Sequence, residues 1–121
     1  MKKEINDIND IRLLVDTFYD KVRKDELLAP IFVEKITEWQ NHLDTLYRFW
    51  QTILLEQQTY QGAPFPKHSD LPLTHQHFDR WLSLFHQTVD DLYTGPVAEE
   101  AKFHAIKISE VFRYKMELTG F

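Results

Sequence analysis

The residue of this chain with the clearest potential for chemistry is His68, which lies between two helical stretches. Residues 60–81 read YQGAPFPKHSDLPLTHQHFDRW, and the glycine and prolines before the histidine predict a loop. A loop can set the angle of an imidazole ring without following a helical repeat, and neutral imidazole is a common metal ligand. His68 therefore suits an axial metal ligand, although the loop alone, without its flanking pattern, favours an ordinary surface histidine.

The sequence does not contain the motifs of several other metal sites. With no cysteine, it excludes disulfides, thiolate catalysis, and cysteine-ligated zinc or iron–sulfur centres. It has no Glu-x-x-His pair of the kind that di-iron bundles use and no His-Glu-x-x-His zinc motif. It also has no Cys-x-x-Cys-His motif, so any haem would be held non-covalently.

Length and composition indicate one globular domain. The chain has 121 residues, of which 43% are hydrophobic and 14% aromatic. The net charge of −5, without a dense stripe of lysine and arginine, argues against a nucleic-acid partner or an anionic membrane surface. The first ten residues lack the apolar run of a signal peptide, and no segment approaches the roughly 18 apolar residues of a membrane span. We expect a cytoplasmic monomer.

Apolar residues recur at helical spacing in four stretches. The first runs from Ile8 to Val22, with Asn6, Asp7 or Asn9 as its cap. The later stretches are 37–56, which opens on the capping-box pattern TEWQ, 74–93, which Thr74 can cap, and 97–118. Pro30 limits residues 25–32 to a short turn. No long stretch alternates apolar and polar residues, so the prediction is a single all-α domain.

Several motifs together make the chain resemble a known family. They are FYDKV (18–22), PIF (30–32), EWQNH (38–42), FW (49–50), YQGAP (60–64), KHSDLP (67–72) and HFDRWLSLF (77–85). In this order they resemble the truncated haemoglobins of the third group, from near Ile8 to the end of the chain. The resemblance implies a globin-like two-over-two helical sandwich around haem b, with residues 1–121 forming one domain.

The resemblance also implies roles for individual residues. The proximal ligand of the haem iron falls on His68, and the distal residues fall on Tyr19, His42 and Trp81. Candidate walls of the haem pocket are Phe18, Phe32, Trp39, Leu46, Tyr60, Leu71 and Phe78, although most of these would equally serve as ordinary core residues. Candidate contacts to the haem propionates are Lys67, His75, Arg48 and Arg80, for which a solvated charge is the alternative.

The distal residues have types that suit a bound diatomic ligand. Dioxygen gains partial negative charge at a haem, and the phenol of Tyr19 and the indole of Trp81 are hydrogen-bond donors that would stabilise it. His42 could donate to the ligand, swing as a gate, or bind the iron as a sixth ligand. The alternatives are a tyrosine that anchors a helix, a core tryptophan, and a boundary histidine. Of the other histidines, we expect His104 to lie in the core.

Three functions remain open at this point. The first is reversible binding of dioxygen or another diatomic ligand, such as nitric oxide, carbon monoxide or cyanide. The second is a haem redox enzyme, either a nitric oxide dioxygenase or a peroxidase-like enzyme, with a reductase as partner. The third is a haem-free helical interaction domain, which predicts a colourless protein.

Overall fold

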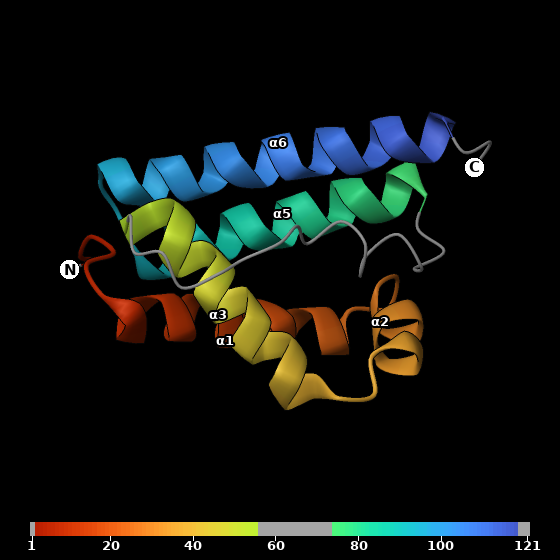
Figure 1. The fold of residues 1–121 in the computed structure, drawn as a ribbon, viewed down its shortest axis with the longest axis horizontal. Helices are drawn as coiled ribbons and strands as arrows, with labels where there is room; N and C mark the ends of the chain where they lie inside the picture. The colour runs from red at the N-terminus through yellow and green to blue at the C-terminus, as the bar shows by residue number, and fades with distance from the viewer. Residues whose placement is uncertain (1, 56–73, 119–121) are drawn as a thin grey trace.

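A computed structural model describes residues 2–55 and 74–118 of the chain. Within these residues it contains five α-helices: α1 (Ile8–Lys24), α2 (Ala29–Lys35), α3 (Trp39–Leu55), α5 (His75–Leu92) and α6 (Pro96–Leu118). Helices α5 and α6 run antiparallel as one pair, and α1 and α3 cross each other as the second pair (Figure 1). Helix α1 also packs on α5, and this contact joins the two pairs into a two-over-two globin-like sandwich.

Side-chain caps fix the starts of two helices. Among the three residues that the sequence offered for the start of α1, Asp7 is the cap, since its side chain accepts a hydrogen bond from the backbone nitrogen of Asp10 at 3.1 Å. The prediction that Thr74 caps the next described helix is confirmed. Its backbone nitrogen donates to Nδ1 of His77 at 3.0 Å, while its hydroxyl accepts from the backbone nitrogen of His77.

Two predicted boundaries differ from the structure. Residues 25–32 were expected to be only a short turn, but α2 begins within them at Ala29, runs on to Lys35 and has Pro30 in its first turn. A proline is tolerated there because the first amide groups of a helix have no partner within it. The TEWQ pattern predicted a start at Thr37, but α3 begins at Trp39.

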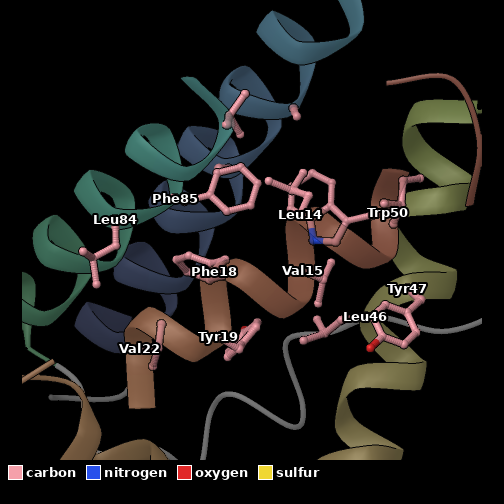
Figure 2. Close-up of a cluster of buried hydrophobic side chains, with 14 of the residues drawn as sticks. Leu14, Val15, Phe18, Tyr19, Val22, Leu46, Tyr47, Trp50, Leu84 and Phe85 are labelled. Carbon is pink, nitrogen blue, oxygen red and sulfur yellow. The ribbon is translucent and has the colours of Figure 1, made fainter. Parts of the chain in front are cut away.

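The hydrophobic core follows the apolar stripe of α1. Ile11, Leu14, Val15, Phe18 and Val22 are all buried, because residues three and four apart share one face of a helix. Figure 2 shows this stripe meeting side chains from α3, including Leu46 and Trp50, and from α5, including Leu84 and Phe85. No helix among the described residues is long and apolar enough to cross a bilayer.

The segment before α1 is tied to the turn between α5 and α6. The carboxylate of Glu4 accepts hydrogen bonds from the backbone nitrogens of Val97 and Ala98, at 3.0 and 2.9 Å, and so caps α6. The backbone oxygen of Lys3 accepts from the backbone nitrogen of Thr94 at 2.9 Å. Gly95 has a φ of 122°, and a Cβ there would lie 2.1 Å from a carboxylate oxygen of Glu4. Only glycine fits this turn.

Polar contacts hold α5 and α6 together at their edges. Lys102 pairs with Asp90 at 2.8 Å, and Arg113 pairs with Asp79 at 2.6 Å. The expectation that His104 lies in the core is wrong. Its side chain is one-third exposed and lies 3.6 Å from the carboxylate of Glu100.

Candidate functional site

Tyr19 is a polar residue inside an aromatic cluster. It neighbours Phe18 on the buried stripe of α1 and is only 3% exposed. Its ring meets that of Phe18 edge-on at 4.8 Å and the ring of His42 edge-on at 5.5 Å. Trp39 and Phe32 lie further out, with ring centroids at 6.0 and 6.3 Å. Side chains from α1, α2 and α3 thus enclose a single phenol.

The side chain of Trp81 from α5 acts on the hydroxyl of Tyr19 as a hydrogen-bond donor, in that it lowers the pKa of Tyr19. An indole N–H can only donate, so Trp81 is the donor and the oxygen of Tyr19 is the acceptor. This bond therefore does not use the proton of the phenol. Burial raises the pKa of Tyr19 well above its ordinary value, and the hydrogen bond from Trp81 offsets only part of that rise. The phenol stays protonated at neutral pH, and no hydrogen bond among residues 2–55 and 74–118 uses its proton.

A column of stacked rings supports Trp81. Its indole stacks on Phe85, one turn further along α5, with centroids 5.8 Å apart and planes 11° apart. On its other side Phe85 stacks on Trp50 of α3 at 5.2 Å and 19°. Phe18 meets both Trp81 and Phe85 edge-on. The column fixes the plane of the indole and so the direction in which its N–H points.

His42 and Trp39 form the outer side of the cluster, at the start of α3. Both side chains are half-buried, and their rings meet edge-on at 5.8 Å. The guanidinium of Arg23 lies over the ring of Trp39 at 3.9 Å, which is a close cation–π contact. His42 therefore reaches from the edge of the protein to the ring of Tyr19, as a residue that gates access to Tyr19 would need to do.

A small cavity of about 20 Å³ adjoins Tyr19 and Trp81. Apart from these two residues, its lining is apolar: Val15, Phe18, Leu46, Phe49, Trp50, Phe85, Ile108 and Phe112. A volume of this size is enough for about one water-sized molecule. Its apolar walls favour a small uncharged molecule over a polar one.

The remaining predicted residues fall in several places. Phe78 is buried against α6, beside Phe112 and under the guanidinium of Arg113. Arg48 and His75 are exposed. Nε of Arg80 donates to Oδ1 of Asp25 at 2.6 Å.

The Arg80–Asp25 pair links the start of α5 to the end of α1. Oδ2 of Asp25 also accepts from the backbone nitrogens of Leu27 and Leu28, at 3.1 and 3.0 Å. Burial alone would raise the pKa of Asp25, but the hydrogen bonds from Arg80, Leu28 and Leu27 outweigh it and lower this pKa below its ordinary value. Arg80 directly precedes Trp81 in α5, so the pairing of Arg80 with Asp25 helps to position Trp81.

Four predicted residues lie outside the part of the chain that the structure describes: His68, Tyr60, Leu71 and Lys67. The structure therefore brings together the distal candidates Tyr19, His42 and Trp81, together with Phe18, Phe32, Trp39 and Leu46. The roles of Phe85 and Trp50 beneath Trp81 were not predicted. The four-residue spacing of Trp81 and Phe85 on one helix was the available signal.

Comparison with known proteins places this fold and cluster in a family. A model of the bacterial-like globins matches residues 4–116. The group 3 truncated hemoglobin ctb of Campylobacter jejuni is 39% identical over 98 residues, which are 77% of each chain. The group 2 truncated hemoglobin YjbI of Bacillus subtilis is 34% identical over 82 residues, 64% of this chain and 60% of the other.

A solved structure agrees with these matches. The crystal structure of the group III truncated hemoglobin from Campylobacter jejuni superposes with a TM-score of 0.83 at 34% identity, and the match covers 95% of this chain and 94% of the other. The chain therefore belongs to the bacterial-like globin family. Within that family it is a truncated haemoglobin of group III, as the sequence motifs predicted.

Proposed function

We propose that this globin binds haem b non-covalently through His68 and holds a diatomic ligand beside Tyr19, with Trp81 and His42 as further distal residues. One observation carries the proposal. Tyr19 is a buried phenol that lies next to Trp81 at the wall of a largely apolar cavity of about 20 Å³. A donor next to a small dry space is the arrangement that a bound diatomic molecule requires.

The described residues fit a haem on three counts. The aromatic rings around Tyr19 offer flat apolar surface, as a porphyrin needs. The donors are neutral, so they can hydrogen-bond to a ligand without adding charge to a buried site. The chain has no cysteine for covalent attachment, which agrees with a non-covalent group. When bound, the haem would supply an iron centre that takes dioxygen, nitric oxide or carbon monoxide.

The residues of the chain would then determine how long a ligand stays. Tyr19 would donate a hydrogen bond to the ligand, and Trp81 would orient the phenol by donating to its oxygen. A hydrogen bond to a charged acceptor stabilises by about 1.5–3 kcal/mol, which slows release by about 10- to 100-fold. His42, at the edge of the cluster, is placed to control entry.

Side chains around the group would hold and orient it. We propose Phe18, Phe32, Trp39 and Leu46, together with Tyr60, Leu71 and Phe78, as walls. Lys67, His75 and Arg48 remain candidate contacts to the propionates. Arg80 is a weaker candidate because it already pairs with Asp25.

A second function rests on the same donors. Donors held at one ligand, Tyr19 and His42, imply slow release, which suits bulk oxygen transport poorly. They would also polarise an oxygen–oxygen bond, which supports nitric oxide dioxygenation or peroxidase-like chemistry with an external reductase. Turnover of nitric oxide or hydrogen peroxide, measured with a supplied reductant, would separate an enzyme from a simple ligand-binding protein.

The first experiment is an absorption spectrum of the purified protein reconstituted with haem. We expect sharp Soret and visible bands that shift on reduction and on addition of carbon monoxide. The variant His68→Ala should lose these bands, whereas the matched control His75→Ala should keep them. A native spectrum in His68→Ala would move the ligand to another histidine, and no haem uptake by any variant would leave the haem-free interaction domain as the remaining hypothesis.

A further inference from the structure

Helix α6 carries an apolar face that points away from the rest of the molecule. Its buried side consists of residues such as Ala101, Ala105 and Phe112. On the opposite side, large hydrophobic residues are exposed: Phe103 at 54%, Ile106 at 36%, Val111 at 48% and Tyr114 at 62%. In Figure 1 this helix forms one outer layer of the molecule, with α5 beneath it.

Two charged residues lie in the middle of this face, one turn apart. Nζ of Lys107 lies 4.0 Å from a carboxylate oxygen of Glu110, and it also lies 5.4 Å from the ring centroid of Phe103. Both charged side chains are more than half exposed. The face is therefore locally neutral in a chain whose net charge is −5.

The order of residue types along the face is symmetrical about a midpoint between Ile108 and Ser109. Phe103 and Tyr114 are equally far from that midpoint, and so are Ile106 and Val111, and Lys107 and Glu110. If a second α6 lies antiparallel across a two-fold axis at this point, each residue faces its counterpart. Aromatic residues then meet aromatic residues, aliphatic residues meet aliphatic residues, and each lysine meets a glutamate.

We propose that this face of α6 binds a second copy of the chain, in an antiparallel contact with two-fold symmetry. An interface of this kind must be complementary to itself, because the same patch contributes both sides. The apolar residues supply the buried area, while the two crossed Lys107–Glu110 pairs set the register. The proposal replaces the expectation of a monomer that was drawn from the sequence.

The size of the face predicts a weak dimer. Phe103 and Tyr114 are eleven residues apart, which is about 16 Å along a helix. A contact of three turns from each copy falls at the low end of specific interfaces, which bury about 1,200–2,000 Å² in total. We expect a dissociation constant on the order of 10–100 μM, in a range that sedimentation can measure.

The test is analytical ultracentrifugation of the haem-loaded protein over a range of concentrations, with a set of charge variants. The wild type should approach twice its 14.6 kDa mass at high concentration. Lys107→Glu and Glu110→Lys should each raise the dissociation constant at least about tenfold, because like charges then face each other. The double variant Lys107→Glu/Glu110→Lys should restore it to within about threefold, because the pairs are only exchanged.

Two matched controls lie on α1, on the far side of the molecule. Lys24→Glu makes the same charge change at an exposed lysine, and Leu13→Ser removes an exposed hydrophobic residue for comparison with Phe103→Ser. Neither control should change the dissociation constant, whereas Phe103→Ser should raise it. A protein that stays monomeric to about 1 mM overturns the proposal, and so does a dimer that is insensitive to Lys107→Glu or is not restored by the double variant. The readout is mass, so it does not depend on the assignment of His68.

Discussion

Two buried tyrosines in this globin differ in what happens to their protons. Trp81 acts on the hydroxyl of Tyr19 as a hydrogen-bond donor, whereas Tyr47 of α3 donates a hydrogen bond to the carboxylate of Asp16 on α1. Burial raises the pKa of both, and at Tyr47 the hydrogen bond to Asp16 raises it further. Tyr19 can thus serve as a hydrogen-bond donor to a ligand, whereas Tyr47 serves as a structural link between α3 and α1.

The difference lies in the partner that each tyrosine meets. Trp81 can only donate, so it does not use the proton of Tyr19, and no other described residue accepts it beside the adjacent cavity. Asp16 can only accept when ionised, so it accepts the hydrogen bond from Tyr47, while the guanidinium of Arg12 lies over the ring of Tyr47 at 5.7 Å. Burial alone therefore does not mark a functional tyrosine, and the chemistry of its hydrogen-bond partner has to be considered as well.

The largest effect on ligand release should come from removing the hydroxyl group of Tyr19. In Tyr19→Phe, the dissociation rate of dioxygen from the haem-loaded protein should rise about 10- to 100-fold, because a hydrogen bond to a charged acceptor is lost. Stopped-flow replacement of dioxygen by carbon monoxide measures this rate. A rate within twofold of the wild type would contradict a donor role for Tyr19.

The next effect tests the ion pair between Asp25 and Arg80, which joins the end of α1 to the start of α5. Asp25→Asn weakens the bond to Arg80 and should lower the free energy of unfolding by about 2 kcal/mol at pH 7. Because the pKa of Asp25 is lowered in the folded state, its contribution is present above the ordinary value near 3.9 and is lost as the pH falls through the lower folded value. Urea denaturation should therefore show a smaller difference between wild type and variant at pH 3 than at pH 7. An equal difference at both pH values would contradict this assignment.

Trp81→Phe should have a smaller effect on the ligand than the loss of the tyrosine hydroxyl. The variant keeps an aromatic ring next to Phe85 but removes the N–H that orients Tyr19. Loss of one neutral hydrogen bond of about 1 kcal/mol predicts a dioxygen dissociation rate about fivefold faster. If dioxygen dissociates faster from Trp81→Phe than from Tyr19→Phe, then Trp81 is itself the principal donor to the ligand.

The smallest effect on the ligand should come from the other tyrosine. Tyr47→Phe should leave the dissociation rate of dioxygen within twofold of the wild type. It should lower the free energy of unfolding by only about 1 kcal/mol, because the exposed Asp16 regains water in place of the phenol. Chemical denaturation and stopped-flow measurements on one preparation give both values. If dioxygen dissociated faster from Tyr47→Phe than from Tyr19→Phe, Tyr47 and not Tyr19 would be the tyrosine that matters more for ligand release.

Local sequence patterns predicted the helices well because their causes are local. Apolar spacing found the four long helices that the structure contains among its described residues, and Thr74 was correctly predicted as a cap. The sequence left three candidates for the cap of α1, since asparagine and aspartate can both cap a helix. Only the backbone conformation selects Asp7. His104 was wrongly placed in the core, because a residue at the edge of an apolar stripe can turn either way.

The contacts of the site were less predictable because they join distant parts of the chain. Family motifs nominated Tyr19 and Trp81, but nothing in the local sequence indicates that one donates to the other. The bond between Tyr47 and Asp16 spans 31 residues, and the pair of Asp25 with Arg80 spans 55. Such pairs depend on how the helices cross, which periodicity does not determine.

The cap that Glu4 places on α6 has a consequence for the order of folding. Its two hydrogen bonds join residues 93 and 94 positions apart in the chain. During synthesis at roughly 5–20 residues per second, Glu4 emerges about 5–20 s before its partners exist. Closing so long a loop costs entropy that only assembled helices can offset. We therefore expect the cap to form late in folding, when α6 packs onto the other helices of the described chain.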